Sequence, residues 1–173
     1  QMVFDTQTLL PVLADLTAEL EHRRTLFVAA GTPNIAKYNQ VTGEQLTRYI
    51  LAFDEVAEVF DMSGLDKSEK DVVAQITRHL SLIARQGRAF GLHLLLSTQR
   101  PSADLIPGQI RTNLSLRICG RADEILSKII LDSSAAAEQI QLNEQGRFVT
   151  NTGRIFQGFW FDDSMLDTSG NHA

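Results

Sequence analysis

Two adjacent carboxylates, Asp54 and Glu55, directly follow an apolar run from Tyr49 to Phe53 that is typical of a buried β-strand. At a strand's carboxyl end such a pair can serve phosphoryl transfer. The aspartate can hold Mg²⁺ through water, and the glutamate can polarise the water that attacks a γ-phosphate. The same pattern also arises where a strand simply leaves the core for solvent, so the pair needs support from other residues.

A second apolar run, Leu92 to Ser97, is followed by Gln99 and Arg100. Gln99 could sense a γ-phosphate or orient water by hydrogen bonding. Arg100 could neutralise phosphate charge within its own subunit or on a neighbour's nucleotide. The alternative is a polar loop closed by Pro101. Because ligands of parallel sheets bind at the carboxyl ends of strands, we expect these residues and the carboxylate pair to share one edge.

Arginines are concentrated in one segment of an otherwise acidic chain. The net charge is −5, which argues against a free-standing nucleic-acid binder, yet residues 78–121 contain seven arginines, no lysine and one acidic residue. Arginine suits bidentate contact with phosphate and carboxylate groups. The segment therefore indicates phosphate or subunit-interface contacts, unless its arginines are salt-bridged surface residues.

Helices and strands alternate along the chain and would position these side chains. Spacing of apolar residues predicts helices over residues 8–30, from Val72 to a stop at Gly87, over 123–131 and over 135–140. A polar linker is expected to end near Thr47. Short apolar runs predict buried strands over residues 49–53, 92–97 and 114–119, and residues 147–161 predict a β-hairpin with its turn at 151–153. This order predicts an α/β fold with a mostly parallel sheet flanked by helices and an edge β-hairpin.

The segment from Tyr49 to Asp132 resembles the FtsK/SpoIIIE family in the order and spacing of several motifs. The matching stretches are ILAFDEVAEVF (50–60), LSLIARQGRAFGLHLLLSTQRPSADLIPGQIRTN (80–113) and LRICGRADEILSKIILD (116–132), with LEHRRTLFVAAGTPNIAKYN (20–39) upstream. The segments AFDEVAEVFD, ICGRAD and ILDSS are most similar in sequence to those of the coupling ATPases of Gram-positive conjugative elements, and less similar to those of chromosome-segregation translocases.

The resemblance implies the C-terminal part of a RecA-like motor domain over residues 1–162, followed by a tail over 163–173. It implies a parent protein that is a hexameric, ATP-driven and Mg²⁺-dependent DNA translocase, which grips DNA without reading its sequence. Nucleotides would bind between neighbouring subunits. A conjugative motor would also meet a relaxase or secretion-channel proteins.

The resemblance also assigns roles to single residues. Asp54 would hold Mg²⁺ through water, Glu55 would activate the attacking water, and Gln99 would act as the sensor. Arg100 would lie near a subunit boundary. Further candidates for a nucleotide or interface contact are Arg23, Arg24 and Arg117.

The Walker A motif G-x-x-x-x-G-K-[ST], whose backbone amides and lysine hold the β- and γ-phosphates, does not occur in these 173 residues. We therefore expect the chain by itself not to hydrolyse ATP at a useful rate, whereas the parent protein would. Two alternatives stay open: a catalytically dead partner domain kept for assembly, and a protein-secretion ATPase of the same family.

The sequence also argues against a transmembrane helix, a disulfide and a zinc site. The sequence has no apolar run long enough for a transmembrane helix, which favours a cytoplasmic chain whose parent could be anchored through another region. The single cysteine, Cys119, predicts a buried inert thiol, and the four histidines lack zinc-ligand spacing. The aromatic residues Phe156, Phe159, Trp160 and Phe161 are expected in the core of the hairpin sheet.

Overall fold

The computed structural model describes residues 2–3, 5–99, 106–162 and 164. The chain divides into two compact units, residues 1–115 and 116–173, and each is described by itself. The predicted extent of one domain over residues 1–162 stays a prediction. The predicted tail lies outside the described residues apart from Ser164.

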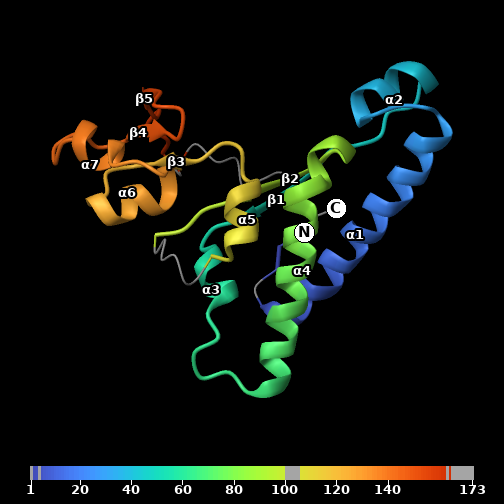
Figure 1. Cartoon of the computed structure of the whole chain (residues 1–173), viewed down its shortest axis with the longest axis horizontal. Coiled ribbons are helices and arrows are strands. Elements are labelled where there is room, and N and C mark those ends of the chain that lie inside the picture. Colours follow the sequence, from blue (N-terminus) through green and yellow to red (C-terminus); the bar gives the residue numbers. More distant parts are fainter. Residues whose placement is uncertain (1, 4, 100–105, 163, 165–173) are drawn as a thin grey trace. The chain divides into compact units, whose positions relative to one another are not determined.

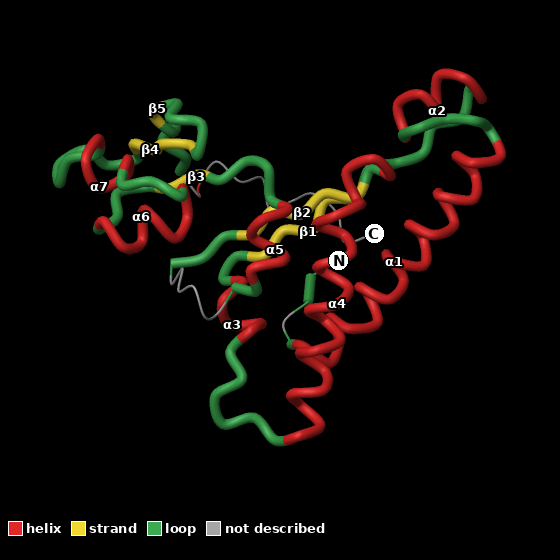
Figure 2. The backbone as a smooth tube through the Cα atoms, in the orientation of Figure 1, coloured by secondary structure: helices red, strands yellow, loops and turns green. Residues whose placement is uncertain are grey.

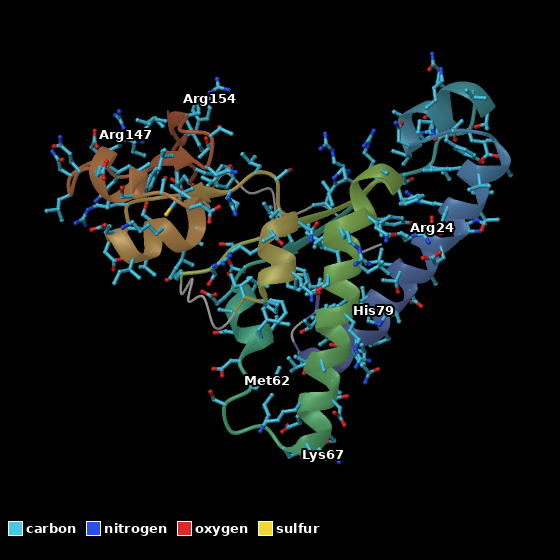
Figure 3. All side chains as sticks on the ribbon, viewed as in Figure 1. Arg24, Met62, Lys67, His79, Arg147 and Arg154 are labelled. Carbon is cyan, nitrogen blue, oxygen red and sulfur yellow. The ribbon has the colours of Figure 1, made fainter. Side chains whose placement is uncertain are left out.

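Two long helices dominate the first unit and lie side by side (Figure 1). They are α1, Thr6–Ala29, and α4, Lys67–Phe90. Asp5 caps α1 by accepting the Thr8 N–H at 2.8 Å, and Asp66 caps α4 in a reciprocal capping box with Glu69. Figure 3 labels Lys67 in the first turn of α4 and His79 farther along it. These caps fix where each helix begins.

A two-stranded parallel sheet carries the predicted catalytic residues. Strand β1, Tyr49–Phe53, pairs with β2, Leu92–Leu96, with Tyr49 opposite Leu92 and Phe53 opposite Leu96 (Figure 2). The pairing continues past both strands, because the Ser97 N–H donates to the Phe53 carbonyl at 2.9 Å and the Val56 N–H donates to the Ser97 carbonyl at 2.9 Å. Both strand ends are therefore held together.

One face of this sheet is packed and the other is open. Leu51, Phe53, Leu94 and Leu96 pack against a core built from α1, α4 and neighbouring helices. On the opposite face Ile50 is 73% exposed and Leu95 is 62% exposed. The prediction that both strands are buried was therefore wrong for one face, because the described residues supply helices to the other face only.

Gly87 does not end the second predicted helix. Helix α4 continues to Phe90, and Gly91 at φ 82° forms its left-handed C-cap. Gly87 is buried inside the helix, where an added Cβ would lie 2.6 Å from the Leu92 carbonyl oxygen. Its role is to let α4 approach the backbone of β2.

Three short helices complete the first unit. Helix α2, Ile35–Thr42, occupies part of the predicted polar linker, capped by Asn34 and ended by Gly43 at φ 76°. Helix α3, Val56–Phe60, follows the carboxylate pair directly. Helix α5, Gly108–Asn113, was not predicted and buries Ile110 against the core.

The second unit contains a three-stranded antiparallel sheet in the order β3-β4-β5, with two helices. Its elements are β3 Ile118–Cys119, α6 Glu124–Leu131, α7 Ala135–Gln139, β4 Arg147–Thr150 and β5 Ile155–Gln157. Both helices and the hairpin confirm the predictions. The third predicted strand is shorter than expected and pairs antiparallel with β4. Cys119 is buried, and this burial raises the pKa of its thiol, as expected of an inert cysteine.

The aromatic cluster at the end of the hairpin is exposed, so the prediction of a core role was wrong. Phe159 is 101% exposed and Trp160 is 90% exposed, and Phe161 is exposed as well. The physical reason is that β5 ends at Gln157, so these side chains lie beyond the paired part of the sheet. Phe156, within β5, is partly covered by stacking on Phe148 at 5.5 Å between ring centroids.

The close approach at Gly87 makes a testable prediction. We expect Gly87→Ala to destabilise the chain by about 1–3 kcal/mol, because the added methyl collides with the Leu92 carbonyl despite alanine's better helix propensity. The matched control is Gly108→Ala in α5, where no described atom beyond its chain neighbours and its own helix backbone lies within 4 Å of an added Cβ, so the change should be neutral or slightly stabilising. Urea denaturation measures both, and an equal effect of the two substitutions would contradict the packing.

Candidate functional site

The carboxyl ends of β1 and β2 meet around the side chain of Glu55. Its Oε1 accepts hydrogen bonds from the Thr98 hydroxyl and, at 3.2 Å, from the Ala57 N–H. Its Oε2 accepts the Gln99 main-chain N–H at 2.7 Å. Glu55 is also the N-cap residue of α3. The carboxylate is thus fixed between the two strand ends, with donors from both sides.

Asp54 and Gln99 lie at the same edge with their side chains exposed. In the described part of the chain Asp54 makes no ion pair or side-chain hydrogen bond, whereas the main chain of Gln99 contacts Glu55 directly. The structure therefore brings together three of the predicted site residues. Arg100, the fourth at this edge, lies outside the described residues.

The oxygen donors at this edge fit a magnesium ion held mainly through water. Mg²⁺ in phosphoryl-transfer sites is usually bound by one or two carboxylates together with waters and substrate phosphates. Asp54 offers such a carboxylate, exposed beside the strand end. Among the described residues no group of three or more histidine, cysteine or acidic side chains could hold a metal by itself.

Arg23 lies in the core of the first unit. Its side chain is 2% exposed, its Nε pairs with Glu19 at 2.6 Å, and an Nη donates to the Phe90 carbonyl at 2.7 Å. The guanidinium carbon also lies 5.0 Å from the ring centroid of Tyr49. These contacts tie α1 to the end of α4 and to the start of β1. A nucleotide or interface role for Arg23 stays a prediction.

Arg24, labelled on α1 in Figure 3, borders a pocket of about 780 Å³ at the amino ends of the strands. It pairs with Glu21 at 3.1 Å and bonds Gln86. The basic pocket also contains, in order along the chain, Arg48, Arg85, Arg88 and His93. Among the described residues that line this pocket none carries a carboxylate, although Glu21 pairs with Arg24 at its border. Such a surface favours an anion.

Arg117 is held within the second unit. Its guanidinium pairs with Asp132, a residue with left-handed backbone at φ 60°, and its main-chain N–H donates to Asn151 at 3.1 Å. Its side chain is 17% exposed. The contacts hold the loop after α6 against the strand region, and an interface role for Arg117 remains a prediction.

Two groups of residues were not singled out from the sequence. Thr98 contacts Glu55 across 43 positions of sequence. The sequence feature that could have identified Thr98 is its position between the end of a predicted strand and the proposed sensor Gln99. Arg48, Arg85 and Arg88 have exposed side chains without a hydrogen bond or ion pair within the described part of the chain. The excess of arginine in the sequence pointed to the last two, but not to their common pocket.

Comparison with protein families matches residues 1–103 to a model described as the FtsK/SpoIIIE family. A relative named DNA translocase FtsK, from Campylobacter jejuni subsp. jejuni serotype O:23/36 (strain 81-176), is 36% identical over 140 residues, covering 78% of this chain and 14% of that protein. The chain thus spans about one-seventh of that relative. Both findings confirm the resemblance seen in the sequence.

Solved structures with the same fold include the pCW3 conjugation coupling protein TcpA, a monomer form with ATPγS. It matches with a TM-score of 0.87 and 34% identity, over 95% of this chain and 47% of that one. The cytoplasmic domain of the Thermomonospora curvata type VII secretion ATPase EccC matches with a TM-score of 0.65 and 21% identity, over 95% and 20% of the two chains. The match to TcpA confirms the predicted fold class. Across the residues that the structure describes, no helix has the length and apolar character needed to span a bilayer.

The different surroundings of two neighbouring arginines lead to a prediction. We expect Arg23→Ala to destabilise the chain by about 2–3 kcal/mol, because it leaves the Phe90 carbonyl without its donor and opens a gap in the core. Arg24→Ala should cost less than about 1 kcal/mol, since its ion pair is largely exposed. Guanidinium denaturation compares the two. Equal losses would contradict the core position of Arg23.

Proposed function

Because the chain belongs to the FtsK/SpoIIIE family, we propose that it forms part of the motor domain of an ATP-driven DNA translocase. The parent protein would be a hexameric conjugation coupling ATPase or a chromosome-partitioning type of pump, working in the cytoplasm where ATP and DNA are available. The observation that carries this proposal is the fixed position of Glu55 beside Asp54 and Gln99 at the carboxyl edge of the parallel sheet. The similarity to a coupling protein solved with ATPγS supports it.

Each residue at this edge has a step that its position suits. Glu55, held by donors from Ala57, Thr98 and Gln99, would accept the proton of the water that attacks the γ-phosphate. Asp54, exposed at the strand end, would bind a water of the Mg²⁺ shell. The exposed side chain of Gln99 would hydrogen-bond the γ-phosphate or the attacking water. Mg²⁺ held there by Asp54 would neutralise negative charge that develops on the phosphates in the transition state.

A phosphate-binding loop is needed in addition to this edge. The 173 residues contain no G-x-x-x-x-G-K-[ST] motif, so the main cradle for the β- and γ-phosphates must come from sequence outside them. We infer that the chain alone binds ATP weakly and does not turn it over.

The basic pocket suggests how subunits would cooperate. Asp54 and Glu55 follow β1, whereas Arg48 precedes it, so the two polar regions lie at opposite ends of a five-residue strand, about 16 Å apart. In a head-to-tail ring two different faces of neighbouring subunits meet, and we propose that the carboxyl edge of one subunit faces the basic pocket of the next. The pocket arginines would then stabilise the phosphates bound by the adjacent subunit.

DNA would be gripped through its phosphates without reading of sequence. The arginine-rich segment over residues 78–121 supplies positive charge in a chain whose net charge is −5. In conjugation, the partners would be a relaxase and proteins of a secretion channel.

A secretion ATPase is the second candidate function, and the secretion ATPase EccC matches this chain in fold. At 21% identity this match supports the fold alone, whereas the more similar TcpA is a conjugation coupling protein. A catalytically dead assembly domain is the third candidate. A relaxase gene beside the parent gene would support conjugation over secretion.

The proposal predicts a difference between the chain and a longer version that includes the phosphate-binding loop. Only the longer protein should hydrolyse Mg-ATP, DNA should raise the rate, and Glu55→Gln should lower kcat at least about 100-fold, the usual contribution of a general base. A steady-state phosphate-release assay measures the rates. The matched control is Glu58→Gln in α3, an exposed carboxylate outside the edge. A longer protein that is inert with Glu55 intact would support the dead-partner alternative.

Mixing two inactive variants tests the role of the pocket. Both variants are made in the longer protein that includes the phosphate-binding loop. Subunits with Glu55→Gln keep the basic pocket, whereas subunits with both Arg85→Ala and Arg88→Ala keep the carboxylate edge. Mixed rings would contain some complete interfaces, so we expect hydrolysis to return partly on mixing, while neither variant recovers alone. Lys70→Ala, an exposed cation on the same helix but outside both the pocket and the arginine-rich segment, should stay active. If mixing restores nothing although mixed rings form, the arginines do not act across the interface.

A further inference from the structure

Thr98 lies just past the end of β2, next to the proposed sensor Gln99, and contacts the carboxylate of Glu55, which follows β1. Its hydroxyl donates to Glu55 Oε1, while the main-chain N–H of the next residue, Gln99, donates to Oε2 at 2.7 Å. Two successive residues therefore bind the two oxygens of one carboxylate. The third donor is the Ala57 N–H of α3, at 3.2 Å from Oε1.

The backbone before Thr98 is fixed by the sheet. Both main-chain polar groups of Ser97 are hydrogen-bonded. Its N–H donates to the Phe53 carbonyl, and its carbonyl accepts the Val56 N–H, each at 2.9 Å. The two partners flank the Asp54–Glu55 pair in sequence. Thr98 follows this anchored residue directly, so the paired sheet defines the position from which its side chain extends.

From this geometry we propose that Thr98 is a positioning residue for ATP hydrolysis, which holds the Glu55 carboxylate in line with the sensor Gln99. The role rests on the proposed function, in which Glu55 is the general base. Thr98 itself touches neither nucleotide nor water in this mechanism. It acts through the carboxylate.

The physical need for this contact follows from the length of the glutamate side chain. Glutamate has three rotatable bonds, and a base must lie within hydrogen-bonding reach of the water that it deprotonates. Displacement of a catalytic group by about 1 Å can cost about 100-fold in rate. Of the donors that the described residues place on Glu55, the Ala57 and Gln99 groups belong to the main chain, and the Thr98 hydroxyl is a side-chain contact that fixes Oε1 from the β2 side.

The same arrangement links sensing to base position. The peptide group of Gln99 is bonded to Oε2, so a shift of Gln99 toward a γ-phosphate moves a donor of the base. Thr98 ties the other oxygen to the same short segment. The segment and the carboxylate would therefore move as one unit when nucleotide binds.

The test compares variants of the longer, hydrolysing parent protein. Thr98→Val keeps the side-chain shape but removes the hydroxyl, and should lower kcat about 10- to 100-fold with KM for ATP unchanged within about twofold. Thr98→Ser restores the hydroxyl and should recover most of the rate. The matched control is Thr77→Val in α4, whose hydroxyl donates only to the Val73 carbonyl of its own helix among the described residues and should have little effect.

A double-mutant cycle with Glu55→Gln separates positioning from general damage. If Thr98 acts through Glu55, Thr98→Val should cause no further loss in the Glu55→Gln background, whereas damage to the fold would add to it. A rate unchanged by Thr98→Val, a loss not rescued by serine, or additive losses would each overturn the positioning role. A parent protein that is inert with Thr98 and Glu55 intact would instead refute the proposed function, and the positioning role with it.

Discussion

The hydrogen-bonded register between β1 and β2 determines where every side chain of the catalytic edge lies. The bonds through Ser97 carry the pairing beyond the strands, so that α3 begins immediately beside the end of β2. A slip of one residue would turn the packed leucines outward and carry Glu55 away from Thr98. The chemistry proposed for this edge therefore depends on main-chain geometry set in the interior of the first unit.

The opposite end of the sheet depends on two close approaches. Arg23 reaches from α1 to the last carbonyl of α4, and Gly87 allows α4 to contact the backbone of β2. The helix therefore ends at a defined height above the sheet, and its last two turns present Arg85 and Arg88 to the basic pocket. Core packing at one end thus positions the cationic groups that we propose to act on phosphates bound by a neighbouring subunit.

The sequence predicted the features that are encoded locally. Strand β1 was predicted at its observed bounds, and the carboxylates after it lie at the expected edge. Helix α2 was missed because its eight residues lack a strong apolar period, although Asn34 and Gly43 are ordinary helix-end residues. Three features depend on contacts between residues far apart in sequence, and the local spacing of apolar residues cannot predict such contacts. They are the open face of the sheet, the burial of Arg23 and the bond from Thr98 to Glu55. The exposed aromatics were misjudged because hydrophobicity does not reveal where a strand stops pairing.

Glu55 would serve two purposes with one carboxylate, because the group proposed as the general base also caps α3 through Oε1. Selection for folding and selection for turnover therefore act on one side chain. A homologue that had lost catalysis would still gain from an acceptor at this position, and would keep glutamate or exchange it for glutamine. Asp54 has no such structural duty within the described residues. If Asp54 holds Mg²⁺ as proposed, retention of the aspartate among relatives would be the more informative marker of a working motor.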